Sequence, residues 1–252
     1  MSQHQDREHA PHLRICDTQP RFHKGVAHLL VDCFLAEAET LDAVLQRLAT
    51  VLDHPARGAM VAVYCDRDGV DKVIGFVDNF MTETPSGIKR WEIDLLAVDS
   101  KWQGLGIGSA LVEKSFAEAE ARRANLTRAL VRVDNVACQH AFTRNGFGRI
   151  EPTFGLFVGS EAGGGIQAQL PDYAYPVHVE TCLYRGCWVE KSKGNLTVED
   201  LERARSYLHR LDQAAAEIIG GLVPREHDDE NTVTRPKGYD LVGHYEWWVR
   251  QA

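Results

Sequence analysis

The feature that most constrains this sequence is a glycine-rich turn between a predicted strand and a predicted helix. A strand-like run at 89–98 is followed by QGLGIG at 103–108, and apolar residues at helical spacing come next. Glycines let backbone N–H groups converge on an anion, and the following helix adds the positive end of its dipole. This order predicts an α/β protein with a diphosphate-binding turn. A tight connection that binds no ligand is the alternative.

Hydrophobic periodicity predicts one mixed, mainly antiparallel sheet flanked by helices over residues 12–190. Asp and Gly residues at 65–69 indicate a hairpin turn. The glycine-rich stretch 159–176 is predicted to be a mobile loop or lid. Strands are predicted at 12–16, 60–64, 73–80, 89–98, 126–133, 147–158 and 177–189, and helices at 20–34, 41–52, 106–123 and 135–145.

Residues outside this range are expected to be additions to the domain. We expect residues 1–11 to be a disordered tail and residues 191–252 a C-terminal helical and aromatic extension. In the extension, an apolar face predicts a helix over 198–219 that Gly220-Gly221 stops, followed by a linker at 224–236. The aromatic end would either join two copies or fold back over the ligand-binding side of its own domain. We favour a homodimer.

Composition excludes several classes of protein. The net charge of −8 argues against nucleic-acid binding, and no apolar run approaches the roughly 20 residues of a membrane helix. Without a signal-like start, we expect a cytoplasmic protein with reduced thiols. The six cysteines are scattered without metal-ligand spacing, so we predict free thiols and no metal site.

The turn and the segments after it resemble the GNAT superfamily of acetyl-CoA-dependent N-acetyltransferases. The matching residues are Gln103-x-x-Gly106-x-Gly108, then Asn135 and the segment 142–147, within a resemblance that covers about 12–190. It implies the GNAT fold and acetyl-CoA as co-substrate. The turn would hold the pyrophosphate, and the pantetheine arm would follow the strand edge. The cofactor-binding residues so implied are Leu96, Ala97, Val98, Gln103, Gly104, Leu105, Gly106, Ile107, Gly108, Ser109, Asn135 and Phe142.

Acetyl transfer to an amine requires a base, because an amine with a pKa near 10 is protonated at neutral pH. Strand alternation puts Glu92 and Asp94 on one face, opposite Ile93 and Leu95. Glu92 falls where several members of the superfamily carry a general base, and Asp94 would orient a water or bind a cationic substrate. The backbone N–H of Leu96 would stabilise the oxyanion. A solvated polar face is the alternative for both carboxylates.

Two positions are ambiguous in this resemblance. Asn135 would bind the pantetheine arm or cap the helix that it begins. Phe142 occupies the position where the superfamily often has a tyrosine that protonates the CoA thiolate. Protonation is then left to water or to another group such as Tyr173, Tyr175 or Tyr184.

The predicted reaction is acetyl transfer from acetyl-CoA to a primary amine in a ternary complex, with a small-molecule amine favoured. The alternatives are a protein N-terminus or lysine as acceptor, and a CoA-binding regulatory module without catalysis.

Overall fold

The computed structural model describes residues 12–34, 41–52, 54, 56–159, 170, 172–211, 218–225 and 235–251, with the backbone alone for 205–211. None of the described helices is long and apolar enough to cross a membrane. The elements in chain order are β1 (His12–Asp17), α1 (His23–Phe34), α2 (Leu41–Val51), β2 (Arg57–Cys65), β3 (Asp71–Glu83), β4 (Lys89–Val98), α3 (Ile107–Ala121), β5 (Leu126–Arg132), α4 (Val136–Arg144), β6 (Gly148–Gly159), β7 (Ala174–Glu180), β8 (Arg185–Lys191), α5 (Val198–Leu211), β9 (Ile218–Pro224) and β10 (Asp240–Gln251), with short 3-10 turns at Pro20–Phe22 and Ser100–Trp102.

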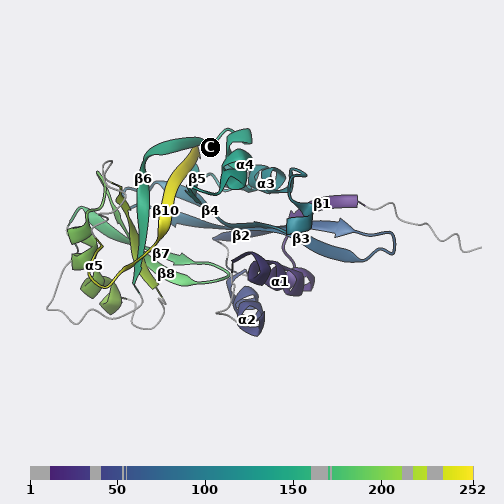
Figure 1. Cartoon of the computed structure of the whole chain (residues 1–252), viewed down its shortest axis with the longest axis horizontal. Helices are drawn as coiled ribbons and strands as arrows, with labels where there is room; N and C mark the ends of the chain where they lie inside the picture. The colour runs from purple at the N-terminus through teal and green to yellow at the C-terminus, as the bar shows by residue number, and fades with distance from the viewer. Residues whose placement is uncertain are drawn as a thin grey trace, which may run out of the picture.

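The described strands form one sheet in the order β1-β2-β3-β4-β5-β10-β6-β9-β8-β7. The pairs β4–β5 and β8–β9 are parallel, and the other neighbours are antiparallel. Helices α3 and α4 cover one face of the first strands, and α1 and α2 cover the other (Figure 1). The predicted fold class, a mixed and mainly antiparallel sheet flanked by helices, is therefore confirmed.

The predicted C-terminal helical extension is wrong. Helix α5 ends at Leu211, and residues 218–224 form β9, so the glycine pair lies inside a strand and does not stop a helix. A Cβ atom at Gly220 would collide with the Trp188 ring, and one at Gly221 would lie 2.6 Å from Leu201. These glycines let a tryptophan ring and α5 pack directly on the strand.

The aromatic end of the chain is also a strand. β10 lies between β5 and β6, with Trp247 opposite both Leu130 and Ile150. Trp248 is buried in the core beneath α3 and α4. The sheet therefore continues past residue 190, and the C-terminal strand pairs within its own chain.

The single strand predicted at 177–189 is a hairpin, β7–β8. The Thr181 hydroxyl accepts the N–H groups of Leu183 and Tyr184, which closes the turn between the two strands. A periodicity of two continues across both strands, so the sequence pattern did not reveal the reversal. The predicted tail at 1–11, and most of the predicted lid and linker, lie outside the described residues.

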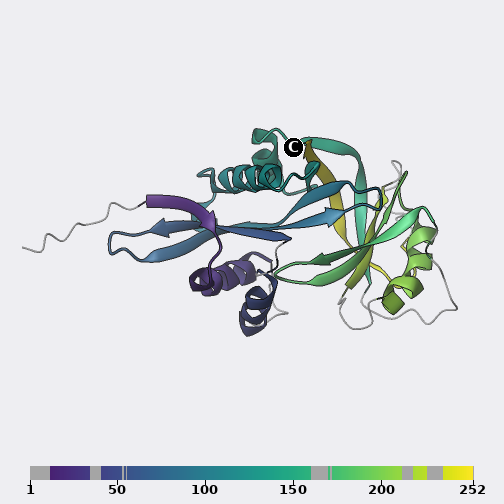
Figure 2. The same ribbon diagram turned by 180° about the vertical axis from the view of Figure 1, so that it is seen from behind.

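The tip of this hairpin packs on β3 and β4, so the sheet curls back on itself (Figure 2). The Cys182 N–H donates to Asp78 Oδ2 at 3.0 Å, and the Tyr184 hydroxyl donates to Asp94 Oδ2 at 3.2 Å. Arg57 bonds the Glu180 carbonyl. The curl leaves a concave space between β4–β5, β10–β6 and β7–β8, and this space positions the site.

Candidate active site

The glycine-rich turn has an open backbone cradle. Gly104 and Gly106 have φ of +78° and +80°, and a Cβ atom at either position would meet nothing within 4 Å. The Gln103 amide donates to the Val98 carbonyl at 3.1 Å, which ties the turn to the end of β4. Gly106 is the N-cap of α3, so the first N–H groups of that helix have no partner within the helix. The donors and the empty space suit a diphosphate.

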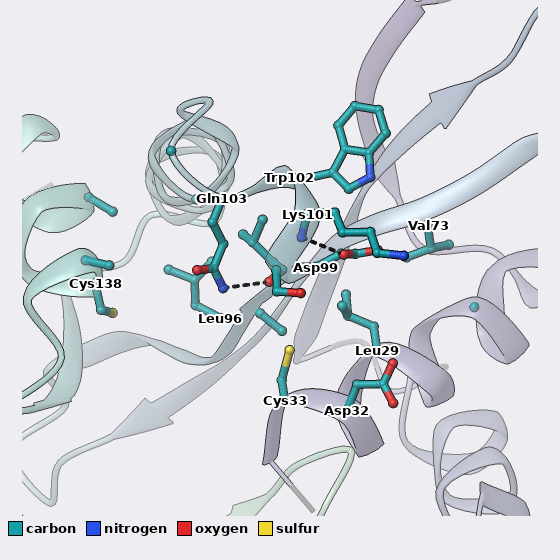
Figure 3. A pocket seen from close by; sticks show the side chains of 18 of the residues that line it. Leu29, Asp32, Cys33, Val73, Leu96, Asp99, Lys101, Trp102, Gln103 and Cys138 are labelled. Atoms are coloured by element: carbon teal, nitrogen blue, oxygen red, sulfur yellow. Dashed lines mark hydrogen bonds between the residues drawn. The ribbon is translucent and has the colours of Figure 1, made fainter.

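A cavity of about 1230 Å³ extends from this turn between α1, β4 and α4 (Figure 3). Leu105 and Ile107 do not line it, because Leu105 points to solvent with 67% exposure and Ile107 is buried in the core. Any contact that these two residues make with a ligand in this cavity would come from their backbone atoms. The predicted cofactor-binding residues that line the cavity are Leu96, Ala97, Val98, Gln103, Gly104, Gly106, Gly108, Ser109 and Asn135.

Strands β4 and β5 separate beside this cavity. Their pairing ends at Ile93 and Ala129, and a β-bulge interrupts the β3–β4 register at Leu95, where φ is +45°. The bulge reverses the alternation of side chains. Ile93 packs beneath α3, whereas Leu95 packs with α1 and α2, so the expectation that both lie on one face is wrong. Leu96 reaches the opening between the strands.

A second cavity, of about 970 Å³, lies within the curl of the sheet. Both Glu92 and Asp94 line it, as strand alternation predicts for this part of β4. The two cavities meet, because they share the lining residues Cys33, Phe34, Leu96, Asn135 and Cys138.

Asp94 is the carboxylate best placed to exchange a proton. Burial and the neighbouring Asp78 carboxylate raise the pKa of Asp94 to about 6, against the opposing effects of the Leu95 N–H and the Tyr184 hydroxyl. Among the residues that the structure describes, Asp94 forms no ion pair. A carboxylate with this pKa is ionised at neutral pH and accepts a proton readily.

Glu92, in contrast, belongs to an ion-pair network. Arg128 Nε lies 2.8 Å from Glu92 Oε2, and Arg90 and Thr82 also contact this carboxylate. The same two arginines hold Glu190 of β8; burial alone would raise its pKa, but they outweigh burial and lower it to about 2. The network joins β4 and β5 to β8, so Glu92 has a structural role in addition to any catalytic one.

Other candidates have clear contacts. The Asn135 side chain accepts the Cys138 N–H, so its predicted capping role is confirmed. Phe142 is 1% exposed and packs edge to face on Phe147, outside the first cavity. Burial raises the pKa of the Cys138 thiol to about 12, which agrees with a packing role.

Of the three tyrosines proposed to replace the missing acid, Tyr184 lines the second cavity. Tyr173 donates to Asp200 and Tyr175 donates to Glu190. Burial raises the pKa of Tyr184 well above its usual value, so its hydroxyl keeps its proton at neutral pH.

Sequence reasoning missed several residues of the site. Asp78 pairs with Asp94 across β3 and β4. Arg128 lies on β5, and Tyr245 and Trp247 lie on β10, the next strand of the sheet. Glu190 lies on β8, which only the curl brings to β4. Alternation within β10 put Tyr245 and Trp247 on a common face, but nothing in the pattern showed what that face covers.

Comparisons with known proteins agree with this architecture. Residues 23–147 match the model of the acetyltransferase (GNAT) family. A GCN5-related N-acetyltransferase from Sphaerobacter thermophilus is similar over 95% of each chain, at 11% identity and a TM-score of 0.55. The similarity in fold therefore extends over nearly the whole chain.

Other solved structures are similar over part of the chain. A ribosomal-protein-alanine N-acetyltransferase from Brucella melitensis is similar over 56% of this chain and 88% of its own, at 19% identity and a TM-score of 0.47. A chain of the NatC complex bound to Gag peptide and CoA is similar over 55% of this chain and 86% of its own, at 20% identity and a TM-score of 0.45. No curated protein sequence matches this chain.

Proposed function

The chain belongs to the acetyltransferase (GNAT) family and is an acyltransferase, and we propose that it moves an acetyl group from acetyl-CoA to the primary amine of a small molecule. The transfer is direct, within a ternary complex. The observation that carries this proposal is the meeting of two cavities at Leu96. One has a diphosphate cradle, and the other has a carboxylate that forms no ion pair with any described residue.

Acetyl-CoA supplies the activated thioester. The proposed contacts are the backbone N–H groups of residues 103–109 for the pyrophosphate, and the separated edge of β4 at 96–98 for the pantetheine arm. The Leu96 N–H, at the β-bulge, is the proposed donor to the acetyl oxygen. This arrangement is supported by the open space at Gly104 and Gly106 and by the end of β4–β5 pairing at Ile93.

We propose Asp94 as the general base, acting on the amine directly or through water. Its supports are its position in the second cavity, its lack of an ion pair among the described residues, and its pKa of about 6. The assignment of Glu92 as base stays a prediction, and its ion pairs with Arg128 and Arg90 favour a positioning role. Tyr184, hydrogen-bonded to Asp94, is the tyrosine best placed to return a proton to the thiolate.

Calorimetry with acetyl-CoA and a thiol-release assay over a panel of amines test this function. We expect binding of acetyl-CoA and amine-dependent release of CoA. Binding without release for any amine or peptide would favour a regulatory module. Release with peptide amines alone would favour a protein acetyltransferase.

A further inference from the structure

The second cavity has a wall that is mostly apolar and aromatic. The hairpin contributes Val177, Val179 and Trp188, and β10 contributes Tyr245 and Trp247. The hairpin residues face β4 and β5 across the curl of the sheet, whereas Tyr245 and Trp247 lie on β10, the strand next to β5. Because the C-terminal strand lies between β5 and β6, the chain itself encloses the space next to Asp94.

Two of the aromatic rings are fixed by neighbours. The Arg128 guanidinium lies 4.0 Å from the centre of the Trp247 ring, and Trp188 packs edge to face on Tyr184 at 6.4 Å. Arg128 is in turn held by two carboxylates. The wall is therefore formed before an acceptor enters, which favours a shaped apolar ligand.

The described charged residues that line this cavity are in ion pairs, with one exception. Six charged lining residues each have a partner of opposite charge. These pairs are Glu92 with Arg128 and Arg90, Glu190 with Arg90 and Arg128, Arg132 with Asp134, Glu151 with Arg149, which also pairs with Glu246, and Lys191 with Asp200. The remaining charged lining residue is Asp94, which forms no ion pair with any described residue. Among the described residues, the cavity thus offers one carboxylate outside any ion pair to an incoming amine.

We propose that the acceptor is an apolar amine with a single positive charge, whose amino group meets Asp94 and whose body packs on Tyr245, Trp247 and Trp188. This inference rests on the proposed function and names the substrate class of the same site. A polyamine would bring a second cation to a wall whose other described carboxylates are already in ion pairs, at the cost of desolvating an unpaired charge. A peptide would bring backbone N–H and C=O groups to an apolar wall.

A matched pair of acceptors tests whether the site prefers an amine with a single positive charge. Hexylamine and 1,6-diaminohexane have the same chain and differ by one charge, and Ala-Leu-Ala amide serves as the peptide. Binding of each is measured by calorimetry on the CoA-saturated protein, and turnover by thiol release with acetyl-CoA. We expect hexylamine to exceed the other two by about 10-fold or more in affinity and in kcat/KM.

Every outcome of this comparison bears on the inference. Equal or better binding of the diamine or the peptide would overturn it, and so would binding of CoA without binding of any amine. Selective binding of hexylamine without thiol release would support the inference and contradict the proposed transfer.

A charge variant provides an independent test. Val242 lines the cavity on β10 and is 49% exposed, so a polar side chain there is compatible with the fold. Val242→Glu adds a second carboxylate, and we expect it to raise the preference for the diamine over hexylamine by about 5-fold or more. Val242→Gln has the same shape without the charge, and Val70→Glu places the charge on the β2–β3 turn, outside both cavities. If Val242→Glu left the preference between the diamine and hexylamine unchanged, or if either control shifted it equally, the proposal of a singly charged acceptor would be contradicted.

Discussion

Asp78 of β3 and Asp94 of β4 are direct partners in the strand pairing, so their carboxyl groups lie on the same face of the sheet. Asp78 is fully buried and is bound by Arg57 and by the Cys182 N–H. Asp94 instead faces the second cavity. Burial and the negative charge of Asp78 both oppose ionisation of Asp94, so the fold itself supplies a carboxylate with a raised pKa.

The pH dependence of kcat tests this pair. With saturating substrates, activity should fall as the pH drops through about 6, where Asp94 becomes protonated. The groups that face Asp94 are Asp78 from β3, Arg57 from β2, Tyr184 from the hairpin and Tyr245 from β10. Asp78 carries a negative charge that opposes ionisation of Asp94. Asp78→Asn should therefore lower the pH at which kcat falls on the acidic side of the profile by roughly one unit. If a folded variant had an unchanged pH profile, Asp78 would have no effect on the pKa of the base.

Asp94→Asn should lower activity without lowering the stability of the fold. Loss of the base should lower kcat by about 10²-fold or more while acetyl-CoA affinity holds. The pKa of Asp94 is raised in the fold, so its ionisation destabilises the folded state as the pH rises from about 4 to about 6. The variant should therefore have a higher Tm than the parent above pH 6 and an equal Tm below pH 4. Full activity at neutral pH would exclude Asp94 as base.

Glu92→Gln distinguishes a base from a positioning residue. The substitution removes one charge from a buried network with Arg128 and Arg90, so unfolding free energy should fall by about 3 kcal/mol in urea titration. If Glu92 only positions β4, kcat should recover when Arg128→Met is added to restore the charge balance. A stable Glu92→Gln variant with about 10²-fold lower turnover would instead support Glu92 as the base.

Gly108→Val tests the diphosphate cradle at a position that the fold tolerates. A Cβ atom there would lie 3.8 Å from Val98, an ordinary contact, and the position has a helical backbone. We expect a folded protein that does not bind acetyl-CoA in calorimetry. Gly108→Ala provides a smaller obstruction, and should stabilise the protein by about 0.5–1 kcal/mol while weakening binding. Gly106→Val should also abolish binding, with added strain from its positive φ. If both valine variants kept the parent's affinity for acetyl-CoA, the glycine-rich turn would not be its binding site.

Truncation before residue 237 tests the role of the C-terminal strand. Because β10 pairs with both β5 and β6, its loss would leave one edge of each of these strands without a partner, and the core would lose Trp248. We expect loss of the cooperative thermal transition in circular dichroism. A folded, active truncation would indicate that the terminal strand is an accessory segment.

The sequence alone determined the local structure around the turn. Glycines at 104 and 106 adopt the positive φ that only glycine adopts freely, and the strand before them and the helix after them lie within a few residues of their predicted bounds. Short-range periodicity was sufficient here, because each of these elements has one face on a continuous core. The capping role of Asn135 is likewise a local interaction, three residues long.

The acceptor side was decided by tertiary structure. Glu92 and Asp94 share a face in any extended strand, but only the β8 strand folded over β4 provides Glu190 to complete the ion-pair network around Glu92. Glycines at 220 and 221 look like a helix stop in sequence and are in fact the flat surface on which Trp188 and α5 pack. Pairing between β10 and β5 joins residues more than a hundred positions apart, and no local pattern encodes such a partner. Strand partners, and the charges that they bring together, depend on how the whole chain buries its apolar faces.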